Sequence, residues 1–373
     1  MKFLICVASY NEKENISKLI PLLDAQFKKF PKHAFTVLVI DGNSPDGTGA
    51  EVLRLAKTYK FLKLLPEKEK AGLGAAYMFG FATAMEEYSP DYIFEMDADM
   101  QHDPKDLGKF IKAIEGGADY VIGSRFVKDG SIPKKWGLYR KSLSIGGSYF
   151  AKICLWIFAV NDFTSGYKAT RVKGYLDKVD LNTIRSKGFA YKIDLLYRIH
   201  RLGARIEEVP IKFGLRDRGD SKMERNNMLD SLKVVLSIRL KESANFIKFV
   251  VVGFIGLATD LSVFNLLRIS MSSANSSYLS GAVAMIVTYL FNNFWSFNDR
   301  KISSNTNLVK RFPVYALSSL IPIVARSLLI KSGVARFGDT ALVANILFLV
   351  GVTFGVIWNF TVYSKFIWKA PNK

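Results

Sequence analysis

The chain has 373 residues, with 52 Lys and Arg against 33 Asp and Glu, so its formal net charge is +19. Apolar residues make up 49%, which excludes an intrinsically disordered chain. The two cysteines, Cys6 and Cys154, lie far apart, and this excludes a disulfide scaffold and a cysteine zinc site.

The charge is divided unevenly along the chain. Residues 244–373 carry only 12 Lys and Arg and 3 Asp and Glu, whereas the first 243 residues hold the rest, as is typical of a soluble enzyme. We therefore predict a globular domain over 1–225, an amphipathic interfacial helix over 226–243 and a membrane domain over 244–373.

In the first part, short apolar and β-branched runs alternate with helical patterns. The predicted strands are Phe3–Ala8, Thr36–Ile40, Phe61–Leu65, Tyr92–Met96 and Tyr120–Ile122. The predicted helices are Glu14–Lys28, Thr48–Lys57, Gly72–Glu87 and Pro104–Glu115. This alternation predicts an α/β fold with a mostly parallel sheet covered on both faces. Ligands of such sheets bind beyond the carboxyl ends of the strands.

The strand Tyr92–Met96 is followed directly by Asp97-Ala98-Asp99-Met100-Gln101. Two carboxylates and an amide oxygen are hard ligands, suited to Mg²⁺ or Mn²⁺ shared with phosphates. A lone pair of aspartates often only caps a turn, but the position after a buried strand favours a site. We therefore predict a metal site formed by Asp97, Asp99 and Gln101.

Two other loops leave alternatives open. Asp41 begins a turn that enters the next helix, where it either holds a ribose or base or belongs to a plain loop capped by Asp46 or Thr48. Arg125 follows a strand end, and its two-pronged geometry suits phosphate as well as a surface salt bridge. By contrast, the segment before Gly72-x-Gly74, Glu67-Lys68-Glu69-Lys70, is not a predicted strand, which excludes a dinucleotide fingerprint.

The second part contains four apolar runs, at residues 245–269, 278–297, 312–330 and 341–363. Each is near the ~20 residues that cross a bilayer as a helix. Basic residues in loop 298–311 and in the tail predict a multi-pass protein whose catalytic domain and both termini are cytoplasmic. Asp260 and Arg326 lie inside predicted spans, as functional groups or as a structural pair between helices.

Two stretches are predicted to lie in the headgroup plane, Gly137–Val160 and Met228–Leu240, with ordinary core helices as the alternative. Basic residues there would face anionic headgroups or an anionic lipid. A charge spread around membrane spans fits nucleic acid poorly, so we expect no nucleic-acid partner.

Taken together, the ordered motifs resemble those of family 2 glycosyltransferases of the dolichol-phosphate mannose synthase group, over roughly residues 1–225. The motifs are Ser9-Tyr10-Asn11-Glu12, Asp41 to Thr48, Asp97 to His102, Gly123-Ser124-Arg125, Asp162 to Tyr167, Glu208 to Ile211 and Arg216 to Lys222. The tail resembles the GtrA-like four-helix membrane domain that is fused to some members.

This resemblance implies a GT-A fold with a divalent cation, Mg²⁺ or Mn²⁺. It implies an enzyme, a dolichyl-phosphate mannosyltransferase, that moves mannose from GDP-mannose to dolichyl or polyprenyl phosphate at a lipid bilayer and inverts the sugar's configuration. A UDP-glucose-dependent polyprenyl-phosphate glucosyltransferase is the alternative. A lipid transporter with a regulatory front domain is a third possibility.

The resemblance also implies roles for individual residues. The nucleotide-binding residues would be Ser9, Tyr10, Glu12, Asp41, Asp97, Gln101, Arg216 and Lys222. The acceptor phosphate would be bound by Arg125, Arg140 and Ser144, and the catalytic residues would be Asp99, Arg125, Arg140 and Asp194. The chain departs from the family pattern at Ala8-Ser9, where Pro-Thr is usual, at Gly42, where a second Asp is usual, and at Asp194, where Glu is usual.

Overall fold

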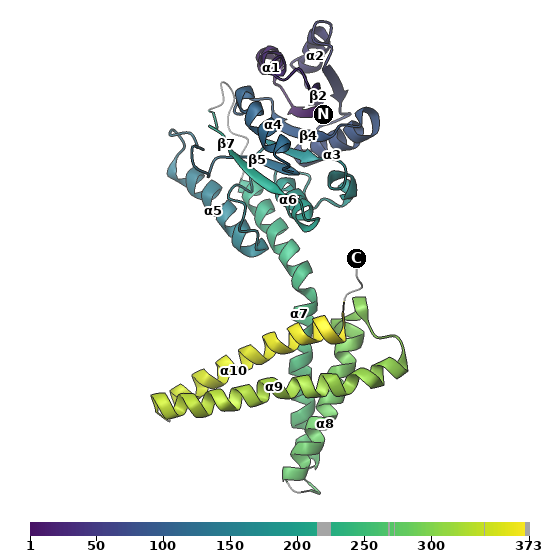
Figure 1. Ribbon diagram of the computed structural model, residues 1–373, viewed down its shortest axis with the longest axis vertical. Helices are drawn as coiled ribbons and strands as arrows, with labels where there is room; N and C mark the ends of the chain where they lie inside the picture. The colour runs from purple at the N-terminus through teal and green to yellow at the C-terminus, as the bar shows by residue number, and fades with distance from the viewer. Residues whose placement is uncertain (215–224, 268, 272, 339, 370–373) are drawn as a thin grey trace. The chain divides into compact units, whose positions relative to one another are not determined.

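A computed structural model describes residues 1–214, 225–267, 269–271, 273–338 and 340–369 (Figure 1). Within these ranges the side chains of some residues, Arg326 among them, lie outside the description. The chain divides into two compact units, Met1–Arg239 and Leu240–Lys373.

The first unit is an α/β domain built around a seven-stranded sheet. Its strands are β1 Lys2–Ser9, β2 Ala34–Asp41, β3 Leu62–Pro66, β4 Tyr92–Asp97, β5 Tyr120–Ser124, β6 Lys168–Arg171 and β7 Ile206–Pro210. The strand order is β3-β2-β1-β4-β6-β5-β7, and every neighbouring pair is parallel except the two that involve β6. The predicted α/β fold with a mostly parallel sheet is confirmed.

Helices cover both faces of this sheet because its strands are apolar on both sides. The helices are α1 Lys13–Phe27, α2 Thr48–Ala56, α3 Leu73–Thr83, α4 Leu107–Glu115, α5 Leu138–Leu155 and α6 Tyr191–Arg201. Phe3, Ile5 and Val7 of β1 belong to the core that includes α1, α2 and α4. The alternate residues Leu4 and Cys6 belong to the core that includes α3 and α6.

The register of the central strands brings three loops together. Ser9 at the end of β1 pairs with Asp41 at the end of β2, and Ala8 pairs with Asp97 at the end of β4. Because these strands are parallel, the polar residues that follow them lie at one edge of the sheet.

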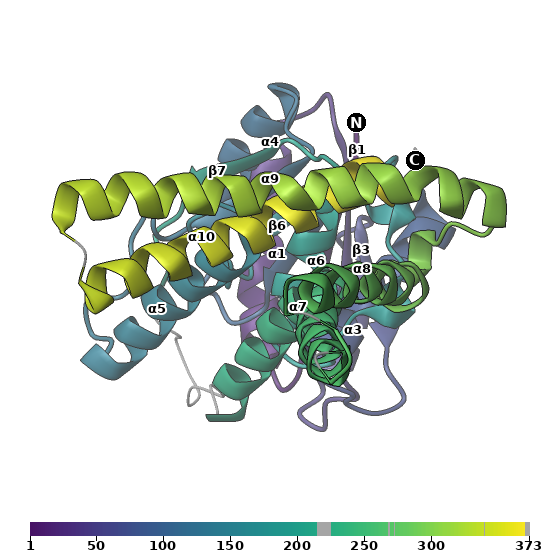
Figure 2. The same ribbon diagram turned by 90° about the horizontal axis from the view of Figure 1, so that it is seen from below.

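Helix α7, Arg225–Leu267, is one continuous helix of 43 residues. The sequence predicts an interfacial helix over 226–243 and a first membrane-spanning run over 245–269, and both, up to residue 267, lie on this one helix because no proline or glycine interrupts the chain between 226 and 252. Helices α8 Ser273–Phe291, α9 Asn305–Phe337 and α10 Ala341–Val362 follow in the second unit. Helices α9 and α10 lie side by side (Figure 2).

Two segments of the described chain, Asn227–Leu267 and Leu349–Ile367, are long and apolar enough to cross a membrane. All four predicted apolar runs are thus largely helical, and two described segments meet the criterion of length and composition for a membrane span. Within the second unit, Ser280 donates a hydrogen bond of 2.5 Å to Asp260. The side chain of Arg326, the other predicted ionisable group, lies outside the described residues.

Candidate active site

A cavity of about 1010 Å³ opens in the first unit, at the carboxyl ends of the central strands. Its wall includes residues predicted for three different tasks. They are Ser9, Tyr10, Glu12, Asp97, Asp99, Gln101, Arg125, Arg140 and Ser144. Residues separated by more than 130 positions in the sequence are therefore brought to one place.

Hydrogen bonds join the loop after β1 to the loop after β2. Ser44 accepts a hydrogen bond from the backbone N–H of Asn11 (3.0 Å), and Asp46 accepts one from Lys13 N–H (3.1 Å). Asp46 also accepts hydrogen bonds from Thr48 N–H (2.9 Å) and Thr48 Oγ1 (2.5 Å). Burial opposes its ionisation, but these hydrogen bonds outweigh burial and lower the pKa of Asp46. These hydrogen bonds fix the loop at the start of α2, whose N-cap residue is Gly47 rather than the predicted Asp46 or Thr48.

Asp41 lies below this loop rather than on the cavity wall. Its carboxylate accepts hydrogen bonds from Ser44 Oγ (2.5 Å) and Ser44 N–H (3.1 Å), and it is 5% exposed. In this arrangement Asp41 holds the loop, and Gly42 stands on the wall in its place.

The loop after β4 presents the two predicted metal-binding carboxylates. Asp99 is buried and accepts a hydrogen bond from Gln101 N–H (3.1 Å). Met100 between them has a positive φ of 63°, a conformation that costs a non-glycine residue about 1–2 kcal/mol. The Asp97 N–H donates to Nδ1 of buried His102 (3.1 Å). Burial lowers the pKa of His102, which favours a neutral ring.

The donor atoms at this loop fit a magnesium-type cation. The described part of the chain holds no cluster of three or more His, Cys, Asp or Glu that could bind a metal by itself. Mg²⁺ is usually bound by one or two carboxylates with substrate phosphates and water completing the shell. Asp97, Asp99 and the amide oxygen of Gln101 would supply the protein's share.

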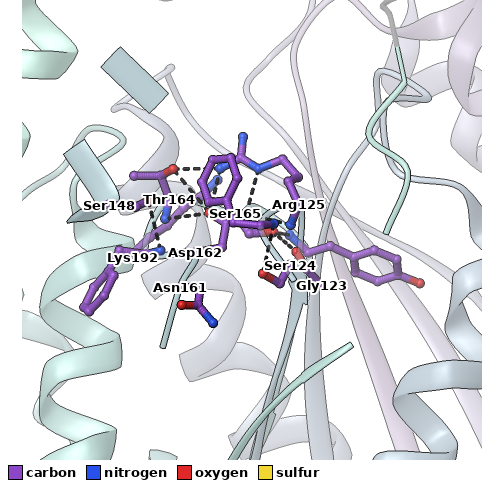
Figure 3. A network of polar contacts seen from close by, with 12 residues as sticks. Gly123, Ser124, Arg125, Ser148, Asn161, Asp162, Thr164, Ser165 and Lys192 are labelled. Atoms are coloured by element: carbon purple, nitrogen blue, oxygen red, sulfur yellow. Dashed lines mark hydrogen bonds and ion pairs between the residues drawn. The ribbon is translucent and has the colours of Figure 1, made fainter. Parts of the chain in front are cut away.

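Arg125 is fixed by a buried ion pair at the end of β5 (Figure 3). Its Nε and Nη2 atoms each donate to Asp162 at 2.7 Å, its backbone N–H donates at 3.0 Å, and Nη2 also donates to Thr164 at 2.7 Å. Burial raises and the Arg125 charge lowers the pKa of Asp162, with a net lowering. The alternative of a surface salt bridge is wrong, because both partners are buried and Arg125 lines the cavity.

The second predicted arginine is held by aromatic stacking. The Arg140 guanidinium lies 4.0 Å from the centre of the Trp136 ring, which meets Phe213 edge-on at 5.8 Å. Arg125 lies 5.3 Å from the same Phe213 ring. Arg125, Arg140 and Ser144 thus all lie on the cavity wall, and their binding of an anion stays a prediction.

Asp194, the remaining residue predicted to be catalytic, is held by two arginines. This carboxylate is fully buried, accepts hydrogen bonds from the backbone N–H and side chain of Arg185, and pairs with Arg198 at 3.2 Å. It is absent from the described wall of the cavity, so its catalytic role stays a prediction. Its position on α6, with neighbours at i+4 and in the preceding loop, makes it a structural ion pair.

The predicted residues Arg216 and Lys222 lie outside the described residues. Conversely, the wall includes charged residues that sequence reasoning missed, namely Glu67, Lys70 and Lys192. Lys70 lies 4.2 Å from the centre of the Tyr10 ring. Burial, followed by the nearby Asp41 charge, raises the pKa of Glu67. In the sequence, the only indication that Glu67 and Lys70 belong to the site is that they lie close to Gly72. For Lys192, it is the position at the start of α6.

Gly72 and Gly74 pack against the loop before α6. Gly74 N–H donates to the Lys187 carbonyl (2.8 Å), and a Cβ on Gly74 would stand 2.7 Å from the Ser186 carbonyl oxygen and 2.8 Å from that of Gly188. The segment directly before Gly72, residues 67–71, is not a strand, in agreement with the sequence-based exclusion of a dinucleotide fingerprint.

Comparisons with known proteins identify the two units. The family model described as glycosyl transferase family 2 matches residues 4–176, and that described as GtrA/DPMS, transmembrane domain, matches residues 248–368. The chain is 30% identical over 362 residues to a dolichol-phosphate mannosyltransferase of Pyrococcus furiosus, covering 95% of this chain and 97% of the relative.

Two further relatives align mainly with the first unit. The chain is 37% identical over 232 residues to a polyprenol monophosphomannose synthase of Mycolicibacterium smegmatis, covering 61% of this chain and 83% of the relative. It is 39% identical over 223 residues to an undecaprenyl-phosphate mannosyltransferase of Micrococcus luteus, covering 60% of this chain and 88% of the relative. The predicted fold class and enzyme class are confirmed. The chain belongs to the dolichol-phosphate mannose synthase group of the family 2 glycosyltransferases and carries a GtrA/DPMS transmembrane domain.

Proposed function

We propose that this enzyme transfers mannose from GDP-mannose to dolichyl or polyprenyl phosphate, with Mg²⁺ or Mn²⁺ as cofactor and inversion at the sugar. The observation that carries the proposal is the shared cavity. A carboxylate pair suited to a cation lies on the same wall as two arginines suited to a phosphate. The names of the relatives supply the sugar and the class of lipid.

At the donor end, the protein would bind a nucleoside diphosphate. Tyr10, Glu12 and Lys70 lie on the wall beside Gly42, where the loops after β1 and β2 meet. Asp97, Asp99 and Gln101 would hold the divalent cation against the diphosphate. The bound cation would stabilise the negative charge that develops on the leaving diphosphate.

At the acceptor end, a phosphate oxygen of the lipid is the nucleophile. It forms a bond to the anomeric carbon as the bond from that carbon to the diphosphate oxygen breaks from the opposite side. A phosphate monoester has a second pKa near ~6, so it is ionised at pH 7 and needs no strong general base. The absence of Asp194 from the described wall is compatible with this chemistry.

The task of the protein is then to hold two anions in line. Arg125 and Arg140 are both fixed by neighbours before any ligand arrives, one by Asp162 and the other by Trp136. Such preorganised cations stabilise charge in the transition state without having to reorient. Ser144 would add a hydroxyl hydrogen bond to the acceptor phosphate.

The acceptor lipid would reach this site along α5. The outer side of this helix exposes large apolar residues, namely Leu138, Tyr139, Ile145, Tyr149 and Ile153. Exposed apolar area of this extent marks a membrane or partner surface, and the GtrA/DPMS transmembrane domain favours the bilayer. With loop 298–311 and the tail rich in basic residues, we propose a cytoplasmic location for the catalytic unit and both termini.

A donor panel tests the proposal. The full-length enzyme in lipid nanodiscs is supplied with GDP-mannose, GDP-glucose, UDP-glucose or UDP-GlcNAc, a polyprenyl phosphate and Mg²⁺ or Mn²⁺. We expect transfer from GDP-mannose, with a β-linked product by NMR and no transfer in EDTA. Transfer from UDP-glucose alone would establish the glucosyltransferase instead, and an α-linked product would contradict inversion.

A further inference from the structure

Lys192 is a buried cation on the wall of the active-site cavity. It is 1% exposed, and its ammonium group has no hydrogen-bond acceptor among the described residues. The closest group with a defined contact is the Phe189 ring, whose centre lies 4.0 Å from Nζ. An ammonium carries three hydrogen-bond donors, and burying it with none of them used is unfavourable. The side chain is therefore in an arrangement that an anionic ligand would complete.

The Lys192 ammonium lies next to Gly166, on the side where a side chain of residue 166 would stand. A Cβ on Gly166 would stand 2.7 Å from Lys192 Nζ, 2.7 Å from Asp97 Oδ2 and 3.0 Å from His102 Cε1. Lys192 and the proposed metal ligand Asp97 therefore face the same space, which exists because residue 166 has no side chain. A ligand that coordinates a cation bound by Asp97 would therefore come within reach of the Lys192 ammonium.

The other cations on the described wall already have partners. Arg125 is bound by Asp162, Arg140 stacks on Trp136 and Lys70 stacks on Tyr10. Lys192 differs from Arg125 in having no hydrogen-bond acceptor within the described chain, and from the half-buried Arg140 and the exposed Lys70 in being fully buried.

The nearby buried carboxylate is engaged elsewhere. Glu95 of β4 pairs in register with Lys168 of β6 and accepts a hydrogen bond of 2.6 Å from Tyr191. Burial raises the pKa of Glu95, with the Lys168 charge opposing this effect. Lys168 is as buried as Lys192 but is absent from the described wall of the cavity, and it donates to the Lys192 carbonyl at 3.3 Å. The two buried lysines therefore differ in their surroundings, because Lys168 faces Glu95 and Lys192 faces the cavity.

We propose that the Lys192 ammonium binds a phosphate oxygen of the donor's diphosphate, next to the cation site, and supports its departure. This inference rests on the proposed function and deepens it. A phosphate fits better than a sugar hydroxyl because only an anion offsets the buried charge. The donor diphosphate fits better than the lipid phosphate because Lys192 shares its space with Asp97 rather than with Trp136.

The test uses K192M, which keeps the length of the side chain and removes the charge, in the full-length enzyme. Inorganic diphosphate, GDP and UDP are titrated calorimetrically with Mg²⁺ present. Because K192M loses one charge-assisted hydrogen bond, its affinity for inorganic diphosphate should be about 10- to 100-fold lower than that of wild type. K168M is the matched control, and we expect less than about a threefold change there because Lys168 does not face the cavity.

The outcomes separate this inference from the proposed donor. If the wild type binds inorganic diphosphate but not GDP, the proposed donor is wrong, whereas a weaker K192M complex still supports Lys192. Equal diphosphate affinity for wild type and K192M overturns the inference. So does an effect confined to the lipid phosphate or to the sugar of the intact donor. K192Q and thermal denaturation of both variants show that a loss of affinity is not a loss of fold.

The affinity for the cation should change in the opposite direction to the affinity for diphosphate. Because Lys192 repels a cation at Asp97, K192M should bind Mn²⁺ alone at least about threefold more tightly, as followed by electron paramagnetic resonance. Weaker Mn²⁺ binding by a folded K192M would contradict the proposed position of the charge. A general distortion of the site would weaken both ligands, so the paired result is specific to this electrostatic role.

Discussion

The Arg125–Asp162 pair makes a sharp prediction, because D162N changes the charge of a buried group while keeping its size. Asp162 is fully buried and receives three hydrogen bonds from Arg125, two of them at 2.7 Å. Breaking a buried, hydrogen-bonded ion pair typically costs about 3–5 kcal/mol, since the remaining charge is left without its partner. We expect a destabilisation of this size.

The expected effect can be measured by thermal denaturation. One kcal/mol shifts the midpoint by about 2–4 °C in a domain of this size, so D162N should lower it by roughly 6–20 °C. At temperatures where the variant is folded, KM for the lipid phosphate should rise, because the guanidinium is no longer fixed in front of the cavity. The exposed Asp177 provides a control, and D177N should shift the midpoint by less than about 3 °C.

The double variant R125M/D162N tests the cause. Removing both charges should recover most of the stability lost in D162N, but acceptor use should stay low because Arg125 is absent. A midpoint for D162N within 2 °C of wild type, or a double variant that is no more stable than D162N, would refute the reasoning.

Four other changes give further predictions. D99N should weaken Mn²⁺ binding at least tenfold with the thermal midpoint little changed; unchanged binding would remove Asp99 from the metal site. W136A should raise KM for the lipid phosphate about 3- to 30-fold, because Arg140 loses its stacking partner, while GDP affinity stays constant. D194N should lower the midpoint yet leave kcat of the folded enzyme within about threefold; a larger loss would support the catalytic role predicted from the sequence. Burial, which outweighs the attraction of Glu95, lowers the pKa of Lys168 to about 8 from 10.5. Between these values the unfolded chain binds more protons, so wild type should gain stability relative to K168M as pH rises from 7.5 to 9.5; a constant difference would contradict that pKa.

Much of the first unit could be predicted from local patterns. The five apolar strands and the helices between them follow from periodicity, and the site lies at the carboxyl ends of the strands. Strands β6 and β7 were missed because Lys168–Arg171 and Ile206–Pro210 are short and contain charged residues. Their strand structure depends on pairing with β5, which is a tertiary effect that no local pattern reports.

At the site, too, local sequence patterns predict only the residues that lie close together in the chain. Asp97, Asp99 and Gln101 could be found because one short segment carries them all. Lys192 could not, since its significance depends on Gly166 and Asp97, which come from distant loops. For Asp194, the motif position did not show which neighbours the carboxylate meets. Here two arginines, Arg185 and Arg198, already satisfy it.

Gly74 packs against the loop before α6, and Gly188 and Phe189 of that loop lie on the cavity wall. Two carbonyl oxygens lie where a methyl group on Gly74 would have to stand, so alanine there would push residues 186–188 outward. That loop leads directly into the turn that carries Lys192. An engineer who wishes to admit a bulkier sugar could therefore begin with a residue that has no side chain and touches no ligand.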